Sequence, residues 1–165
     1  MPGMKPGMTL EIDVMTEHAI TIRPMTDADL PAVIDMWVGT WQAAYPSIDF
    51  EARRGWTENR FAELAQAGAR SFIAEADGEI AGFVMINPAT GYLDQIAVAT
   101  TMQGEGVADS LLAQARALCP TIELHTNKDN ARAIRFYEKH GFVVTGESTN
   151  PRSGAPIYLM RWERK

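Results

Sequence analysis

The chain has 165 residues, of which 46% are hydrophobic and 22% charged, a composition that excludes a disordered or fibrous protein. Its formal net charge of −6 disfavours electrostatic binding to nucleic acid and would weakly attract a cationic substrate. Cys119 is the single cysteine, so it has no partner for a disulfide or a metal site, and we expect no metal. No stretch is apolar enough for a signal peptide or a membrane span, so we expect a cytoplasmic protein without a membrane partner.

The first 18 residues are rich in proline, glycine and methionine and show no sustained hydrophobic period. We therefore expect a flexible leader over residues 1–18 and a single domain over residues 19–165. The domain begins with a short alternating strand over residues 19–23. Thr26 is then placed to cap the helix that follows.

Two helices are predicted after that strand. Apolar residues recur at helical spacing over residues 30–45, and a second helical pattern covers residues 50–67. Within the first helix, Trp37, Trp41 and Tyr45 fall at positions i, i+4 and i+8. Such an aromatic stripe usually packs in the core.

The rest of the chain alternates strands with helices. Asp77 and Gly78 separate two β-rich runs, residues 71–75 and 80–86, and predict a tight antiparallel hairpin. The later elements are strands over residues 92–98, 121–125, 142–147 and 157–162 and helices over residues 105–118 and 129–140. This order predicts an α/β domain with a mixed six- to seven-stranded sheet flanked by helices.

A glycine-containing loop joins the strand over residues 92–98 to the next helix. Gly104 and Gly106 let its backbone curl, and the helix that follows presents unpaired N–H groups at the positive end of its dipole. An anion can bind there. Two other phosphate-binding motifs fit this loop poorly. A P-loop needs Gly-Lys-Ser/Thr, which is absent, and the dinucleotide-binding fingerprint needs a glycine at the position of Asp109. A turn that binds no ligand is the alternative.

This loop resembles a signature of the GNAT superfamily of acetyl-CoA-dependent N-acetyltransferases, Gln/Arg-x-x-Gly-x-Gly/Ala, which Gln103, Gly106 and Ala108 match. The resemblance implies a GNAT-type acyl-CoA N-acyltransferase fold with acetyl-CoA as cosubstrate. It also implies that the pyrophosphate is bound by the backbone N–H groups of Gln103, Gly104, Glu105, Gly106, Val107 and Ala108. The family usually carries Arg or Lys where this chain has Gly104 and acidic Glu105, which weakens the attraction for phosphate.

Residues 130–142 resemble the second signature of the family, Asn-x-x-Ala-x-x-Phe-Tyr-x-x-x-Gly-Phe, and match it at every fixed position. The resemblance implies that Tyr137 donates a proton to the departing coenzyme A thiolate. A phenol with a pKa near 10 stays protonated at neutral pH and suits that role. Core packing is the alternative for Tyr137, and it is our prediction for Phe136.

Three further features of this helix concern the cofactor. Asn130 can cap the helix or, as the resemblance implies, hydrogen-bond the pantetheine arm next to Ala133. Asp129 could cap instead, which favours the cofactor role for Asn130. The basic residues Lys128, Arg132 and Arg135 form a solvated face or meet the adenosine 3′-phosphate.

The strand over residues 92–98 corresponds to the fourth strand of the family, along whose edge the pantetheine lies. The resemblance implies that a backbone N–H among Ile96, Ala97 and Val98 polarises the thioester carbonyl. It makes Asp94 our candidate general base, because strand alternation places it on one face with Ile96 and Val98. A structural carboxylate is the alternative.

His125 at the end of the next strand is interpreted as a packed or surface histidine, and Glu123 lacks a motif. The sequence therefore predicts an N-acetyltransferase that moves the acetyl group of acetyl-CoA to a primary amine by direct attack in a ternary complex. A non-catalytic coenzyme-A-binding sensor is the alternative, and a dinucleotide-binding oxidoreductase is a remoter one. The acceptor is a small molecule or a peptide, and the family places the segment with the aromatic stripe over its pocket. Monomer and homodimer stay open.

Overall fold

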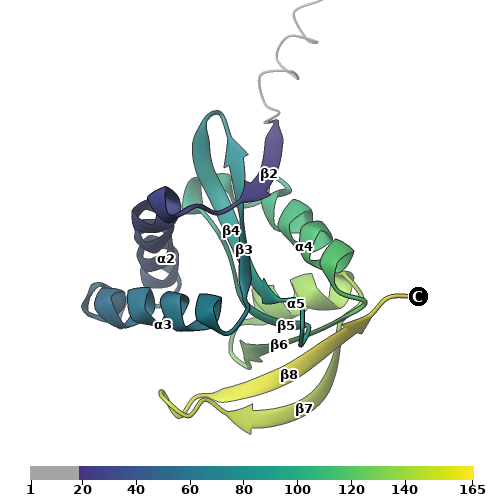
Figure 1. Ribbon diagram of the computed structural model, residues 1–165. Helices are drawn as coiled ribbons and strands as arrows, with labels where there is room; N and C mark the ends of the chain where they lie inside the picture. Colours follow the sequence, from purple (N-terminus) through teal and green to yellow (C-terminus); the bar gives the residue numbers. More distant parts are fainter. Residues whose placement is uncertain (1–18) are drawn as a thin grey trace, which may run out of the picture.

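The computed structural model describes residues 19–165, so the predicted leader over residues 1–18 lies outside the described residues (Figure 1). The strands of the described chain are β2 (Ile20–Pro24), β3 (Arg70–Ala76), β4 (Glu79–Asn87), β5 (Tyr92–Val98), β6 (Thr121–Asn127), β7 (Val143–Thr149) and β8 (Pro156–Glu163). The α-helices are α2 (Leu30–Ala44), α3 (Arg54–Gln66), α4 (Val107–Leu118) and α5 (Ala131–Lys139). None of these helices has the length and apolar character needed to cross a bilayer.

Within residues 19–165 the strands form one seven-stranded sheet with the order β2-β3-β4-β5-β6-β8-β7, which confirms the predicted mixed sheet. Neighbouring strands pair antiparallel except β5 and β6, which run parallel. The predicted hairpin is the β3–β4 connection, where Asp77 and Gly78 both have positive φ angles of 55° and 78°. Every predicted strand is present, with its ends within two residues of the prediction.

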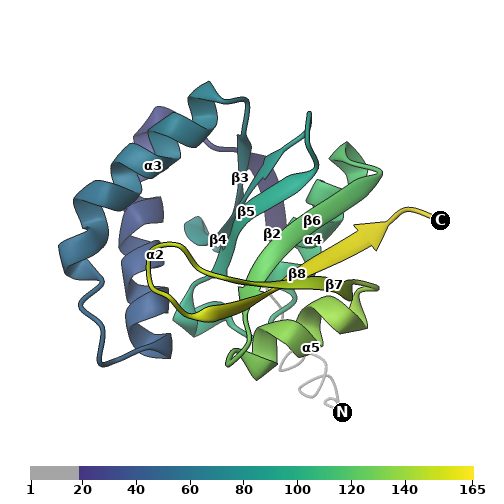
Figure 2. The ribbon, with the colours of Figure 1, turned by 90° about the horizontal axis from the view of Figure 1, so that it is seen from below.

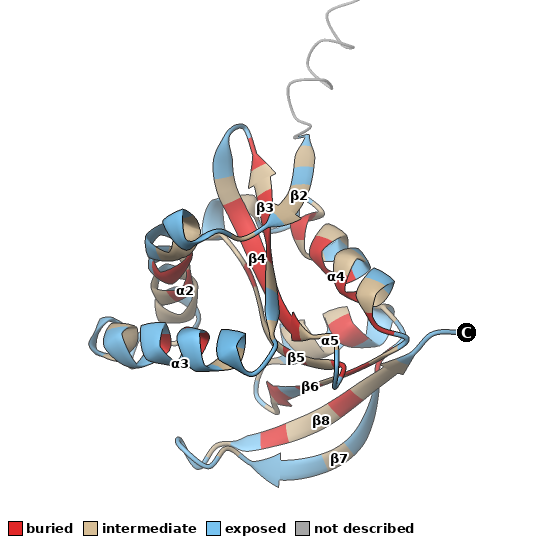
Figure 3. Cartoon of the chain, in the orientation of Figure 1, coloured by how far each residue is buried: buried red, intermediate tan, exposed pale blue. Residues whose placement is uncertain are grey.

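The sheet separates two hydrophobic clusters, because successive side chains of a strand point to opposite faces. On β4, Phe83 and Met85 pack with α2 and α3, whereas Val84 and Ile86 pack with α4 and α5. The ribbon shows α2 and α3 on one side of β3 and β4 and α4 on the other (Figure 1). Buried residues line the inner faces of these helices and strands (Figure 3).

Three helices start later than predicted. The helix expected over residues 50–67 begins at Arg54, after a 3-10 turn over Glu51–Arg53. The helix expected from residue 105 begins at Val107, because Gly106 has a left-handed φ of 83°. The helix expected from residue 129 begins at Ala131, because the side chain of Asn130 accepts a hydrogen bond from the backbone N–H of Ala133 and so forms the N-cap. The last two of these late starts place a non-helical residue at the edge of the space between β5, α4 and α5.

A cluster of ion pairs, here called the ion-paired corner, joins β2 to β3 and to the segment before α2. Arg23 of β2 binds Asp29 with two hydrogen bonds of 2.7 and 2.8 Å, and its Nε donates to Glu75 of β3 at 2.8 Å. Asp29 also accepts from the backbone N–H of Thr26 at 2.7 Å. The Arg23 guanidinium holds the pKa of the Asp29 carboxyl well below its usual range. The corner ties the entrance of α2 to the edge of the sheet.

Candidate active site

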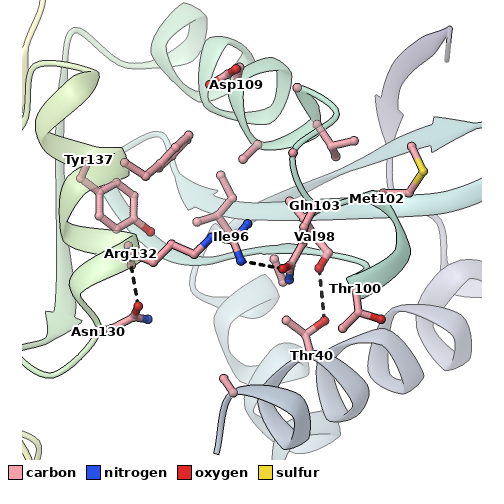
Figure 4. A pocket seen from close by; sticks show the side chains of 18 of the residues that line it. Thr40, Ile96, Val98, Thr100, Met102, Gln103, Asp109, Asn130, Arg132 and Tyr137 are labelled. Carbon is pink, nitrogen blue, oxygen red and sulfur yellow. Dashed lines mark hydrogen bonds between the residues drawn. The ribbon is translucent and has the colours of Figure 1, made fainter. Parts of the chain in front are cut away.

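The parallel strands β5 and β6 diverge almost at once. Within the described chain they share one register pair, Tyr92 with Glu123, supported by a 3.0 Å bond from the Glu123 N–H to the Gly91 carbonyl. Beyond that pair the strands splay apart toward the carboxyl end of β5. A cavity of about 580 Å³ lies beside the splay, between the end of β5, the start of α4, one side of α5 and the end of α2 (Figure 4).

The edge of β5 presents backbone groups to the splay. The N–H of Ala99 donates to the Ala81 carbonyl on the β4 side at 2.8 Å. Because hydrogen-bonding directions alternate along a strand, the amides of Ile96 and Val98 face the other way, toward the gap. The Val98 carbonyl accepts from the Thr40 hydroxyl of α2 at 3.4 Å, which agrees with this direction (Figure 4).

The loop before α4 forms the second wall. The first helical bond runs from the Ser110 N–H to the Gly106 carbonyl at 3.1 Å, so the N–H groups of Val107 and Ala108 lack an acceptor inside the helix. Within residues 19–165 no side chain caps this helix. The N–H of Glu105 was expected to bind the pyrophosphate. It instead donates to the Met102 carbonyl at 3.3 Å and so closes a turn.

Helix α5 forms the third wall. Asn130 is its N-cap through Oδ1, which corrects the expectation that Asp129 would take that role, and its Nδ2 can still donate into the cavity that it lines. The Arg132 guanidinium reaches across the cavity and donates to the Gln103 side chain at 2.8 Å (Figure 4). Of the three basic residues considered from the sequence, Lys128, Arg132 and Arg135, Arg132 is the one that lines the cavity.

Tyr137 presents its hydroxyl to the cavity from α5 (Figure 4). Only 8% of the residue is exposed, and burial raises the pKa of its phenol well above the ordinary value. The ring packs edge-on against Phe136 and near Phe142, with centroids 5.5 Å apart in each pair. Phe136, which was predicted to pack in the core, is partly buried against the core cluster and also lines the cavity.

Comparison with known proteins identifies the fold. A family model described as the acetyltransferase (GNAT) family matches residues 30–142, from the start of α2 to the residue before β7. The chain belongs to the GNAT acetyltransferase family. This confirms the resemblance seen in the two sequence signatures, and it makes the protein an acetyl-CoA-dependent acetyltransferase.

Curated relatives of this acetyltransferase carry related names. It is 25% identical over 141 residues to the peptidyl-lysine N-acetyltransferase YiaC of Escherichia coli, across 86% of this chain and 95% of that protein. It is 27% identical over 146 residues to the L-amino acid N-acetyltransferase AaaT of Escherichia coli, across 81% and 85%. Its fold matches the PaiA N-acetyltransferase from Thermoplasma acidophilum, solved in complex with coenzyme A, with a TM-score of 0.72 at 18% identity over 88% of this chain and 99% of that one.

Most of the residues expected to bind the cofactor lie together around the cavity. Those that line it are Ile96, Ala97, Val98, Gln103, Gly104, Gly106, Val107, Ala108, Asn130, Ala133 and Tyr137. Glu105, also expected there, is absent from the lining formed by residues 19–165. The GNAT signatures thus identify the loop and the helix that face each other across the cavity.

Asp94, the candidate base, lies elsewhere than expected. Its neighbours Leu93 and Gln95 pair with two successive residues of β4, so Asp94 is the extra residue of a β-bulge. Leu93 and Ile96 therefore share the face toward α4, and the predicted alternation that placed Asp94 beside Ile96 is wrong. Asp94 is also absent from the cavity lining formed by residues 19–165. Burial raises the pKa of its carboxyl, an effect that Arg60 of α3 partly offsets.

The aromatic stripe of α2 packs in and against the core, and none of its three residues belongs to the cavity lining formed by residues 19–165. Trp37 is a core residue, and its indole N–H has no hydrogen-bond partner among the described residues. Trp41 and Tyr45 are partly buried and stack with centroids 5.7 Å apart. The Tyr45 hydroxyl donates to Asp129 at 3.0 Å and accepts from Asn127 at 3.1 Å, which ties α2 to the loop before α5.

Sequence reasoning missed several residues of the site. Thr40, Met102 and Lys139 line the cavity, although none of them belongs to a signature. The hydroxyl of Tyr92 and Nδ1 of His125 lie 2.6 Å apart on neighbouring strands, a pairing that only the sheet register brings about. Thr40 directly precedes Trp41, and this position next to the aromatic stripe of α2 was the one sequence feature that could have indicated its place at the site.

Proposed function

We propose that this acetyltransferase transfers the acetyl group of acetyl-CoA to a primary amine by direct attack within a ternary complex. One observation carries the proposal. The outward amides of Ile96 and Val98, the hydroxyl of Tyr137 and the uncapped start of α4 converge on one cavity of about 580 Å³. Such a cavity accommodates an extended ligand that has an anionic group at one end and a reactive group at the other.

The chain's own groups would hold acetyl-CoA as follows. The N–H groups at the start of α4 bind the pyrophosphate, where unpaired donors and the helix dipole act together. Arg132 supplies a positive charge at the same wall, offsetting acidic Glu105 in the loop. The outward backbone groups of Ile96 and Val98 pair with the pantetheine amides as a neighbouring strand would, and Nδ2 of Asn130 donates from the opposite wall.

Acetyl-CoA supplies an activated acetyl group when it is bound. The amine nitrogen attacks the thioester carbonyl carbon, a C–N bond forms, and the C–S bond breaks. An outward N–H of Ile96 or Val98 stabilises the negative charge on the carbonyl oxygen, a contribution of about 3 kcal/mol. Tyr137 donates its phenolic proton to the departing thiolate. Burial raises the pKa of that phenol, which keeps it protonated at neutral pH.

The acceptor is an amine, and we propose a lysine side chain in a peptide as the first to test. The curated relatives YiaC and AaaT are named for peptidyl-lysine and for L-amino acids, both of which offer a primary amine. The net charge of −6 would attract a cationic peptide before its amine loses a proton. A free L-amino acid is the second acceptor to test.

Two measurements test this function together. Titration calorimetry should show binding of acetyl-CoA, and a thiol-release assay should show acetyl-CoA-dependent turnover with a lysine-containing peptide. Binding without thiol release from any amine would favour the coenzyme-A-binding sensor instead. If millimolar acetyl-CoA gave no heat of binding, both the acetyltransferase and the coenzyme-A-binding sensor would be rejected as functions of the cavity. NAD is the control ligand, and it should leave the melting temperature unchanged.

A further inference from the structure

A histidine and a tyrosine lie paired where β5 and β6 begin to diverge. Tyr92 is on β5 and His125 on β6, with the phenol oxygen 2.6 Å from Nδ1 and the ring centroids 5.6 Å apart. His125 is exposed, whereas Tyr92 is partly buried. The pair thus presents an accessible imidazole whose orientation is set by a more enclosed neighbour.

The position of His125 follows from strand alternation. On β6, Ile122 and Leu124 enter the hydrophobic cluster under α4 and α5, so Glu123 and His125 project from the opposite face. That face is the α2 and α3 side of the sheet. His125 lies two residues beyond the paired Glu123, which places it on the diverging part of β6. Like Asp94, neither His125 nor Tyr92 is among the residues of the described chain that line the cavity, so the acceptor amine would have to approach the thioester from the α2 and α3 face.

We propose that His125 is the general base that removes a proton from the acceptor amine, with Tyr92 orienting its ring. The proposal rests on the proposed N-acetyltransferase function. This role requires the tautomer in which Nδ1–H donates to the Tyr92 oxygen and Nε2 carries the lone pair that accepts the amine proton. As the nitrogen attacks the thioester carbon, its proton passes to Nε2, directly or through one water, while Tyr137 protonates the thiolate. One proton is thus taken up and one given, so charge and atoms balance.

The ionisable groups around His125 support this assignment. Glu123 on the same strand is committed to Arg161 of β8 at 3.4 Å, and that guanidinium also binds Glu163 at 3.2 Å. On the β5 side, burial raises the pKa of Tyr92 to about 12, and the negative charge of Asp94 adds a smaller effect in the same direction. The Tyr92 phenol therefore stays neutral at pH 7.

The remaining charges near the pair come from other elements. Arg60 of α3 acts on both Tyr92 and Asp94, and it partly offsets the effect of burial on each. The Asp129 carboxylate after β6 already accepts from the Tyr45 hydroxyl. His125 is therefore an exposed imidazole on a face whose nearby carboxylates, Glu123 and Asp129, are engaged by other side chains.

The test is the pH profile of kcat with acetyl-CoA and a lysine-containing peptide. The wild-type profile should show an acid limb, and His125→Gln should remove that limb and lower kcat at pH 7 by about 10²–10⁴-fold. The rise of the variant should follow the amine's own pKa, near 10.4. His125→Glu keeps a base, so it should recover part of the rate with the limb moved below pH 6. Added imidazole should partly rescue His125→Ala.

Two matched variants separate catalysis from structure. Glu123→Gln alters the same face of β6 two residues away and should leave the acid limb in place. Tyr92→Phe keeps the ring but loses the hydroxyl, so it should lower kcat more than it alters the KM for acetyl-CoA. An active wild type whose profile is unchanged in His125→Gln would overturn the role of His125 alone. A wild type that releases no thiol at any pH would overturn the proposed function, and the base with it.

Discussion

Tyr137 combines two properties that rarely occur in one side chain. Its ring is almost fully enclosed among Phe136, Phe142 and the core, yet its hydroxyl reaches the cavity. Enclosure favours the neutral phenol, because a phenolate there would lose most of its hydration. The residue is therefore held in place by packing and kept protonated by the same burial.

The first prediction removes only the hydroxyl of that residue. Tyr137→Phe should lower kcat by about 10²–10⁴-fold and leave the KM for acetyl-CoA nearly unchanged, because the ring still packs while the proton donor is gone. Steady-state kinetics and calorimetry on the same preparation measure both quantities. Turnover at the wild-type rate would show that Tyr137 is a packing residue only.

The second prediction concerns the charge of Asp94. Burial raises its pKa in the folded protein above the unfolded value near 3.9, so the folded state binds the proton more tightly and stability falls as pH rises through that interval. Asp94→Asn should therefore raise the free energy of unfolding at pH 7, with a smaller gain at pH 4. Urea titrations at both pH values measure this.

The same variant compares two candidate bases. If Asp94 and not His125 removes the amine proton, Asp94→Asn should lower kcat at pH 7 and shift its pH profile toward the pKa of the amine. A more stable variant with the wild-type pH profile would leave Asp94 without a catalytic role. An Asp94→Asn protein that is less stable at pH 7 would instead show that the carboxylate gains more from Arg60 than it loses on burial.

At the scale of elements, Gly82 governs how closely β4, β5 and α4 approach. A Cβ atom there would lie 2.7 Å from the Ala97 carbonyl and 2.9 Å from Val107, and both of these residues line the cavity. The absence of a side chain at one position of β4 thus lets two walls of the site come together. No motif in the sequence marks this glycine.

The third prediction follows from that contact. Gly82→Ala should lower the free energy of unfolding by about 1–3 kcal/mol and weaken acetyl-CoA binding, because β5 and α4 must move apart. Gly39→Ala is the matched control, since a Cβ in the middle of α2 meets nothing within 4 Å. That change should stabilise the protein by about 0.5–1 kcal/mol. Chemical denaturation and calorimetry compare the two, and equal effects would contradict the packing argument.

The sequence predicted elements well where period and turn chemistry agree. The β3–β4 hairpin follows from Asp77 and Gly78, and the GNAT signatures place the loop before α4 and the helix α5. Sequence could not show the bulge at Asp94, because an extra residue in β5 changes no local pattern and becomes visible only against β4. The Tyr92–His125 pair escaped for a similar reason, since its two residues are 33 apart in the chain and meet only through the parallel register.

At the scale of the whole molecule, the sheet consists of two parts that share little backbone pairing. One part contains β2 to β5 and the other β6, β8 and β7, and in the described chain the Tyr92–Glu123 pair is the register pair between them. Seen from below, β6 and β8 lie in front of β5, and α5 lies beside β7 and β8, away from α2 and α3 (Figure 2). The hydrophobic cluster under α4 and α5 contains residues of both parts, such as Val84 of β4 and Leu124 of β6.

The single register pair leaves an edge of β5 without a partner strand. The amides of Ile96 and Val98 face the gap, so we expect them to exchange hydrogen with solvent rapidly in the free protein. Acetyl-CoA lying along β5 would pair with this edge as an eighth strand does. Hydrogen–deuterium exchange should therefore slow at Ile96 and Val98 when acetyl-CoA is added, while Val84 and Phe83 in the middle of β4 stay protected throughout. Equal exchange at residues 96 and 98 with and without the ligand would show that acetyl-CoA does not pair with this edge of β5.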